Sequence, residues 1–338
     1  ACTDKMDPVT SYVATNNLKS MELESGGEGK SFGSNTGGML NLQTKEPVLN
    51  DSQKFRGNVS LGFNSVSNGM QTSFNTNYSE SAWALRLNGM YAKHENYTAG
   101  GGEVIEHSQY TKGNFGASFK TKISSKDYIL LDFIRDDARN VGYPALPMDV
   151  SSAEADIYSI TYRRFLTGKW GGKINTKLYG NNITHVMDDS DREVVMRMDM
   201  PGLSETYGAY IQTELNEKNG HKLSMNIDGY QNRSFAEMTM YPEGEDEMYM
   251  LTWPDVYRTM LGIYASDIFT FKNNDYLSVN ARMDIGNSEV RSEFGKKQLE
   301  VFGYEIDDPI EHDVYSFSTE YGKRINAIST LSLSLIHI

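Results

Sequence analysis

The sequence of 338 residues contains one cysteine, Cys2, which excludes a disulfide framework within the chain. It has no run of about 18 apolar residues, so no transmembrane helix is expected, but alternating membrane-crossing strands are not excluded. The net charge of -13 disfavours a nucleic-acid partner, because a phosphate backbone requires a basic surface. No Ser/His/Asp arrangement or paired-carboxylate motif stands out, so we predict that the protein is not an enzyme.

Apolar and polar residues alternate with a period of two through most of the chain after residue 47. The runs 58–64, 83–91 and 114–120 are examples. No stretch of about ten residues has a convincing helical period. The pattern therefore predicts an all-β protein.

The connections between these runs are alternately short and long, and this spacing predicts the architecture. Short turns at one end and long loops at the other are typical of an antiparallel transmembrane β-barrel of the outer membrane. Counting the runs predicts about 12 strands of about 10–14 residues, long enough to cross a bilayer at a tilt. The expected short turns are near 79–81, 124–127, 168–172, 218–220 and 272–275, and the long polar connections are near 94–110, 138–154, 187–203, 235–256 and 290–312.

A glycine-rich stretch precedes the predicted barrel. It contains Met21-Glu22-Leu23-Glu24-Ser25-Gly26, then Phe32-Gly33, and then Gly37-Gly38-Met39-Leu40-Asn41-Leu42-Gln43-Thr44-Lys45. These residues resemble the end of the plug domain of TonB-dependent outer-membrane receptors, which reads I-E-V-x-x-G-P, Y-G and G-G-x-I-N-I-x-T-K before the barrel begins. The resemblance implies that 1–47 is the end of a plug domain and that 48–338 is the N-terminal part of a barrel.

The same resemblance implies a location and partners. A complete barrel of this family has about 22 strands, so we expect the chain to be a fragment that lacks the signal peptide, the TonB box and the later strands. Such a receptor spans the outer membrane of a Gram-negative bacterium and contacts its lipid. It is energised by the TonB-ExbB-ExbD complex, which acts through the TonB box.

Cys2 and Met6 form a candidate metal-binding pair at the start of the sequence. A thiolate and a thioether this close together, in a turn that contains Pro8, suit one soft ion such as Cu(I). The alternative is that Cys2 is a lone buried thiol that fills a gap, which is common for this residue type.

The segment Cys2-Thr3-Asp4-Lys5-Met6-Asp7-Pro8-Val9-Thr10-Ser11-Tyr12 resembles the C-x-x-x-M-D-P-x-(T/S)-(S/A)-Y sequence of the copper-transporting branch of this family. In that branch the plug cysteine and methionine bind copper with a His-x-Met pair from the barrel, which His185-Val186-Met187 matches. By the strand count, this pair lies at the outer end of the seventh strand. Residues at i and i+2 share a strand face, so both can face the plug. The alternative is that His185 is a strand-end histidine hydrogen-bonded to the plug.

Methionine is abundant, with 17 residues, and several methionines follow the pattern Met-x-Met in segments expected to be outer loops. Thioethers stay neutral ligands at any pH, so these pairs are candidates for accessory sites that collect Cu(I) before its delivery. The alternative is adaptable apolar packing within the loops. The candidates are Met196, Met198, Met200, Met238, Met240, Met248 and Met250.

The leading hypothesis is a TonB-dependent transporter that takes up a copper ion as its transported ligand. The first alternative is a TonB-dependent receptor for an iron–siderophore complex or another large nutrient. Uptake of such a ligand that does not depend on Cys2 or His185 would favour it. The second alternative is a surface binding or adhesion protein that uses the barrel as an anchor, and loss of adhesion without loss of uptake would favour that.

Overall fold

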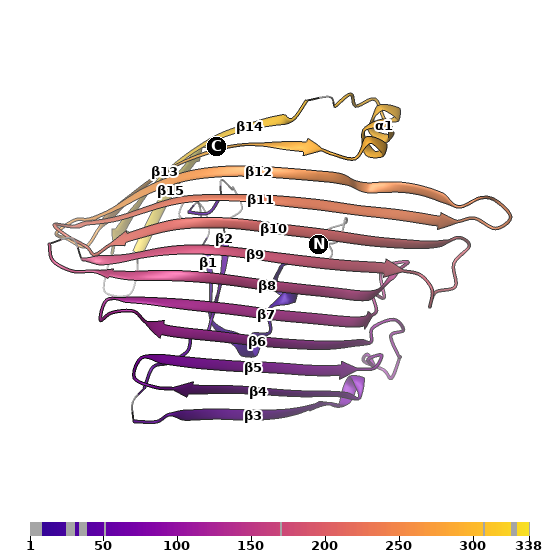
Figure 1. The fold of residues 1–338 in the computed structure, drawn as a ribbon, viewed down its shortest axis with the longest axis horizontal. Coiled ribbons are helices and arrows are strands. Elements are labelled where there is room, and N and C mark those ends of the chain that lie inside the picture. Colours follow the sequence, from indigo (N-terminus) through magenta and orange to yellow (C-terminus); the bar gives the residue numbers. More distant parts are fainter. Residues whose placement is uncertain are drawn as a thin grey trace.

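The computed structural model describes residues 9–24, 31–33, 39–50, 52–169, 171–306, 308–325 and 330–337. Within these ranges, one antiparallel sheet of 13 strands contains most of the chain, and each strand pairs with its neighbours in sequence (Figure 1). The strands are β3 (Phe55–Asn64), β4 (Gly69–Ser79), β5 (Trp83–His94), β6 (Tyr110–Lys122), β7 (Asp127–Val141), β8 (Asp149–Leu166), β9 (Gly172–Asp188), β10 (Arg197–Leu215), β11 (His221–Tyr241), β12 (Met248–Thr270), β13 (Tyr276–Val290), β14 (Ile310–Arg324) and β15 (Thr330–His337). The predicted all-β antiparallel fold is confirmed, and β3 and β15 form the edges of the sheet.

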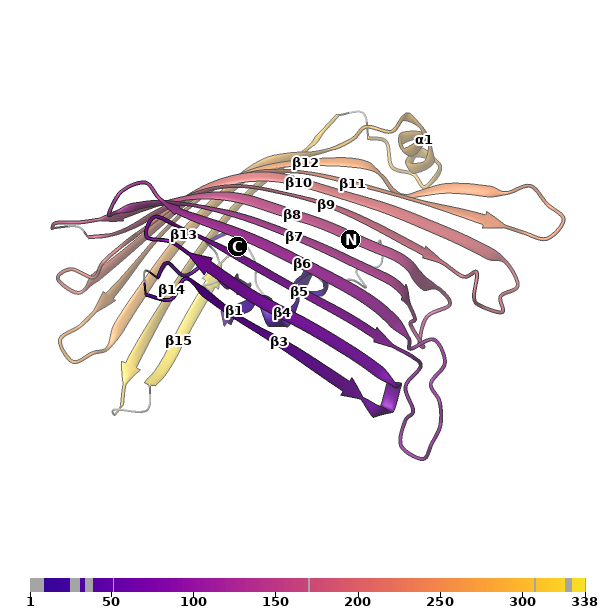
Figure 2. The same ribbon diagram turned by 60° about the horizontal axis from the view of Figure 1, so that its bottom comes forward.

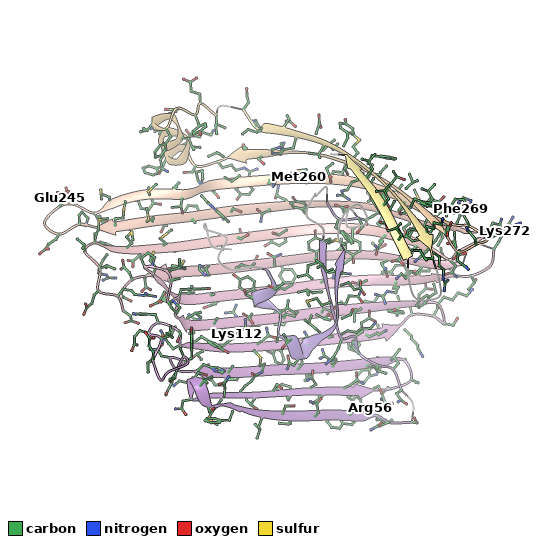
Figure 3. The ribbon with its side chains drawn as sticks, turned by 180° about the vertical axis from the view of Figure 1, so that it is seen from behind. Arg56, Lys112, Glu245, Met260, Phe269 and Lys272 are labelled. Carbon is green, nitrogen blue, oxygen red and sulfur yellow. The ribbon has the colours of Figure 1, made fainter. Side chains whose placement is uncertain are left out.

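The large sheet is curved, and the N-terminal segment lies on its concave side (Figures 2 and 3). This segment consists of two 3₁₀-helices, η1 (Val9–Tyr12) and η2 (Thr15–Asn17), and a separate hairpin of β1 (Leu18–Glu24) and β2 (Met39–Thr44). The segment therefore lies against the wall that the large sheet forms, and the division of the chain into a plug end (1–47) and a barrel part (48–338) stays a prediction.

Two further helices lie in connections between strands of the large sheet. The 3₁₀-helix η4 (Ser65–Ser67) joins β3 to β4, and α1 (Glu293–Val301) lies between β13 and β14. Among the described residues, no helix has the length and apolar character needed to cross a membrane.

The concave face of the sheet, called here the inner face, is polar, whereas the convex outer face is apolar. Contacts with the N-terminal segment identify the inner face, for example the hydrogen bond from Arg86 to Asn17. Side chains alternate between the faces, so each strand contributes to both. Buried polar residues of the inner face include Asn88, Asn114, Asp136, Asn226 and Asn280, and exposed apolar residues of the outer face include Leu131, Leu178, Ile227 and Leu261. A polar interior with an apolar exterior is typical of membrane barrels.

Short and long connections lie at opposite ends of the sheet, as the sequence predicted, except that the short connection 65–68 between β3 and β4 lies at the long-loop end beside residues 95–98. The connections 80–82, 123–126, 167–171, 216–220 and 271–275 form the short-turn end, and 95–109, 142–148, 189–196, 242–247 and 291–309 form the long-loop end. Figure 3 labels Lys272 at the first end and Glu245 at the second.

The central strands extend further toward the long-loop end than predicted. Strands β8 to β12 contain 18, 17, 19, 21 and 23 residues, so the predicted lengths and the predicted loop bounds 138–154, 187–203 and 235–256 are wrong. Backbone pairing continues where the sequence alternation fades, as the pair Met198–Met240 shows. Ladder hydrogen bonds use backbone groups, so pairing does not require an apolar residue at every second position.

Candidate metal centre

Strand β9 places His185 and Met187 side by side on the inner face, near the strand's end at the long loops. Counted from β3, β9 is the seventh strand of the sheet, which is where the turn pattern placed this pair. Both residues are 2% exposed. An imidazole and a thioether are therefore held together in a site from which water is largely excluded.

The N-terminal segment docks on the same part of the wall. Tyr12 is 2% exposed and packs against Ala155 of β8 and Ile183 of β9, with Ile157 beside them. Ile183 and His185 share the inner face, because they are separated by two positions on one strand. Tyr12 therefore brings the chain segment that follows Cys2 and Met6 close to the strand that carries the His-x-Met pair.

Side chains of β6 donate hydrogen bonds to backbone carbonyls of η1. The Asn114 amide donates to the Tyr12 carbonyl at 3.3 Å, and the ammonium of Lys112, which Figure 3 labels, donates to the Ser11 carbonyl. Lys112 also pairs with Asp136, which is 1% exposed, at 3.0 Å. The position of η1 is therefore set by hydrogen bonds and by the packing of Tyr12.

Cys2 and Met6 lie outside the described residues. The structure brings His185 and Met187 together, and their association with Cys2 and Met6 stays a prediction. Among the described ranges, no group of three or more His, Cys, Asp or Glu side chains could hold a metal ion. A metal centre that includes His185 would therefore depend on the sulfur ligands.

Apolar side chains surround Met187. It belongs to a buried cluster whose other members are Ala138, Met148, Val150 and Ala153. Val150 of β8 and Met200 of β10 are its direct cross-strand partners. The sequence analysis did not single out Met148, because an isolated methionine carries no pattern that distinguishes a site from ordinary packing.

A polar cluster covers this apolar group at the long-loop end, and Asp149 is its centre. His107 Nδ1 lies 2.9 Å from Asp149 Oδ2, and Arg192 Nε donates to the same oxygen at 3.0 Å. The backbone N–H of Tyr143 donates to Asp149 Oδ1 at 3.1 Å, and the Tyr143 carbonyl accepts from Arg192 Nη2 at 2.9 Å. The cluster thus ties the connections 95–109, 142–148 and 189–196 together.

The candidate accessory methionines lie mainly on strands, not in loops. On the inner face Met187 pairs with Met200, Met198 pairs with Met240, and Met240 pairs with Met248. Met238 pairs with Met250 on the same face, and Met196 is half-buried just before β10. Directly opposed side chains have Cβ atoms about 4.5–5.5 Å apart, so six of these residues form contiguous rows with Met187 across β9–β12. The loop assignment was wrong because the strands continue through these residues.

The end of the N-terminal segment is held by an ion-pair cluster. Glu46 Oε2 lies 2.9 Å from Lys120 Nζ, and Glu46 Oε1 lies 3.0 Å from Arg163 Nη1. Burial alone would raise the pKa of the Glu46 carboxyl. The Lys120 hydrogen bond and the charges of Arg163 and Lys120 outweigh that effect, and they lower the pKa below its usual value of 4.5.

A second anchor holds residues 31–33 of the N-terminal segment. Arg282 Nη1 donates to the Ser31 carbonyl at 2.9 Å, and Asn226 Nδ2 donates to the same oxygen at 2.6 Å. Arg282 is itself fixed by Asp228 at 2.8 Å and by Asp284 at 2.6 Å. Displacing the segment would therefore break hydrogen bonds to a buried charge, which are stronger than neutral ones.

Several solved structures share this fold. The copper transporter OprC superimposes with a TM-score of 0.86 at 19% identity, covering 99% of this chain and 52% of that one. The FrpB iron transporter from Neisseria meningitidis (F5-1 variant, apoprotein form) gives 0.70 at 13% identity, covering 95% and 52%. The ferric yersiniabactin uptake receptor FyuA from Yersinia pestis gives 0.67 at 11% identity, covering 94% and 51%.

These likenesses establish the fold. The chain has the fold of TonB-dependent outer-membrane receptors, as the plug-end residues implied, and it spans about half the length of the structures that it matches. No protein-family model matches the sequence, and no curated protein sequence matches it.

Proposed function

We propose that this chain is part of a TonB-dependent outer-membrane transporter that takes up copper through a site made of Cys2, Met6, His185 and Met187. The packing of Tyr12 against Ile183 carries the proposal, because it brings the motif-bearing segment to the strand with the His-x-Met pair. The protein acts in the outer membrane of a Gram-negative bacterium. The TonB-ExbB-ExbD complex energises it, and it catalyses no reaction.

The ligand types favour Cu(I). Two thioethers, one thiolate and one imidazole make a soft set that Cu(I) prefers, whereas hard ions require oxygen ligands. Zinc sites are built from thiolates, imidazoles and carboxylates and seldom use thioethers. The apolar residues around Met187 exclude water, which suits a neutral sulfur ligand.

Division of the site between plug and barrel couples transport to copper release. Cys2 and Met6 belong to the predicted plug, whereas His185 and Met187 belong to β9. A pull on the plug separates the two ligand pairs, so the same movement weakens binding and opens a path inward. The anchors at Glu46 and Arg282 resist that movement until the energising complex acts.

The methionine rows extend the proposed copper pathway toward the long-loop end. They continue from Met187 through Met200 and Met198 to strands β11 and β12, so Cu(I) can pass between neutral thioethers before it reaches the principal site. Adaptable apolar packing is the competing explanation. Replacing Met198, Met240 and Met248 by leucine distinguishes the copper pathway from apolar packing. If the pathway exists, the protein binds additional copper weakly, and the replacement abolishes that binding.

One observation favours a second candidate function. Several solved structures with this fold are named as iron transporters or siderophore receptors, among them FrpB and the siderophore receptor PiuA from Acinetobacter baumannii. Under this alternative, the protein takes up an iron chelate and the methionines only line its pocket. Uptake would then be independent of Cys2 and His185.

A single thioether substitution tests the copper proposal. Met187→Leu keeps the size and the apolar packing of the side chain but removes the sulfur. In full-length protein purified with reductant, we expect Cu(I) affinity to fall by about tenfold or more, measured by competition with a chromogenic chelator. Met225→Leu is the matched control, because Met225 is 59% exposed on the outer face of β11. Equal affinity in the two variants would refute the role of Met187.

A further inference from the structure

The connection 142–148 between β7 and β8, called here the lid, covers Met187 at the long-loop end. Met148 of the lid is 5% exposed and belongs to the same buried cluster as Met187, and Tyr143 packs against that cluster. His185 and Met187 are already buried by the residues that the structure describes. Further chain can only bury them more, so a ligand reaches this pair only when a covering element moves.

The composition of the lid suits movement as one piece. Pro144 and Pro147 each fix a backbone φ within it, which makes the segment stiff. Gly142 lies where the lid leaves β7, and glycine has the widest range of backbone angles of any residue. A stiff segment that begins at a flexible position is typical of a hinged lid.

One buried ion pair holds the lid closed. Asp149 Oδ1 accepts from the Tyr143 backbone N–H at 3.1 Å, and Arg192 Nη2 donates to the Tyr143 carbonyl at 2.9 Å. Arg192 Nε donates to Asp149 Oδ2 at 3.0 Å, and the two side chains are 12% and 9% exposed. The backbone of Tyr143 is therefore bound by both members of a single ion pair.

Both members of this ion pair belong to the wall. Asp149 is the first residue of β8 and pairs with Asp188 of β9. The Arg192 N–H donates to the Asp189 carbonyl at 2.9 Å, and the buried Asp189 carboxylate accepts from the Met198 N–H of β10 at 2.9 Å. The lid is therefore the part that moves when Tyr143 is released.

A cavity of about 140 Å³ lies between the lid and η1. Tyr143 and Tyr12 both line it, and its lining shares Ala138, Val150 and Ala153 with the buried cluster around Met187. An ion that passes the lid therefore enters a space that already borders this cluster.

We propose that the lid is a gate to the copper site and that the Asp149–Arg192 ion pair keeps the gate closed. The identity of the ion rests on the function given under Proposed function. Release of Tyr143 from the ion pair lets the lid swing away and connects the long-loop end with the cavity. The ion pair therefore controls how fast the ion enters and leaves, whereas the ligands control how tightly it is held.

The first test measures access to Met187 without copper. Full-length protein in mild detergent is treated with dilute hydrogen peroxide, and mass spectrometry follows sulfoxide formation at each methionine. We expect Arg192→Leu to raise the rate at Met187 by about tenfold, because the lid loses a hydrogen bond to a charged group. Arg291→Gln removes an exposed ion pair and should leave this rate unchanged. Met260 (Figure 3) lies on β12, which β9, β10 and β11 separate from β8, so its rate reports general loosening and should stay constant.

The second test follows copper itself. Arg192→Leu should release Cu(I) to a chromogenic chelator about tenfold faster and take it up faster by a similar factor, with the dissociation constant changed by less than about twofold. Arg192→Lys keeps the charge but loses the paired hydrogen bonds of the guanidinium, so its rates should lie between those of the leucine variant and the unmodified protein. The lysine variant also provides the test if the leucine variant does not fold.

Four results would overturn the gate. They are equal oxidation of Met187 with and without the Arg192 substitutions, a similar rise at Met260, unchanged copper release, and oxidation of Met187 in the unmodified protein as fast as that of the exposed Met225. The oxidation assay contains no copper. A protein that shows the expected oxidation pattern and binds no copper would therefore keep the gate and lose the copper proposal.

Discussion

Tyr12 packs against Ile183, which precedes His185 by two positions on the inner face of β9. This contact joins the N-terminal segment to the strand that carries the barrel half of the candidate site. Neither residue would bind the metal under our account. Their contact instead determines how closely the two ligand pairs can approach.

Removing the Tyr12 ring should therefore loosen the site without changing a ligand. Tyr12→Ala leaves a cavity beside Ala155 and Ile183, and truncating a buried aromatic side chain to alanine costs about 3–5 kcal/mol. We expect weaker Cu(I) binding and faster proteolysis of the N-terminal segment in the full-length protein. Tyr12→Phe preserves the ring and should resemble the unmodified protein in both assays. An alanine variant with normal affinity would show that this contact does not position the site.

The polar cluster around Asp149 should stabilise the long-loop end. Arg192→Leu removes the arginine partner of Asp149, whose side chain is 9% exposed, and leaves the carboxylate with His107 and the Tyr143 N–H; losing a hydrogen bond to a charged group costs about 1.5–3 kcal/mol. We expect faster hydrogen exchange in 142–148 and a lower thermal midpoint. Arg291→Gln is the control, because the Arg291–Glu289 pair is 48% and 43% exposed, and such solvent-screened pairs contribute little to stability. Equal effects in the two variants would contradict a structural role for the cluster.

Glu46 should make the attachment of the N-terminal segment sensitive to acid. The pKa of Glu46 is lowered in the folded protein, so its ion pairs contribute stability that is fully present above the usual value of 4.5. That contribution is lost as the pH falls below 4.5 and through the lowered pKa of the folded state. Protease protection of the segment should therefore decrease over this range in the unmodified protein. Glu46→Gln should flatten this part of the pH profile, and an unchanged profile would assign the acid sensitivity to other groups.

The sequence predicted those parts of the structure that depend on local pattern. Period-two alternation predicted the antiparallel sheet, and the turn spacing put His185 and Met187 at the end of the seventh strand. Met198 and Met200 are two positions apart, so on a strand their side chains lie on the same face.

What the sequence could not predict depends on contacts between distant strands. Asp149 meets His107 and Arg192 across separations of 42 and 43 residues, and no local pattern marks such a cluster. The register that sets Met198 opposite Met240 is fixed by the turn between β10 and β11 and by their whole ladder, not by the methionines. The predicted ends of the central strands were also wrong. Backbone pairing continues beyond the region in which apolar and polar residues alternate, so the strands are longer than predicted.

The most direct test of the account is the copper content of the full-length protein, purified with reductant, compared with a Cys2→Ser, His185→Ala double variant. These substitutions remove one ligand from the N-terminal segment and one from β9. The account predicts one tightly bound copper per molecule in the unmodified protein and none in the variant, with the fold retained by circular dichroism. Equal copper content in both proteins, or no copper in either, would contradict the proposed site and leave the iron-chelate receptor as the better explanation.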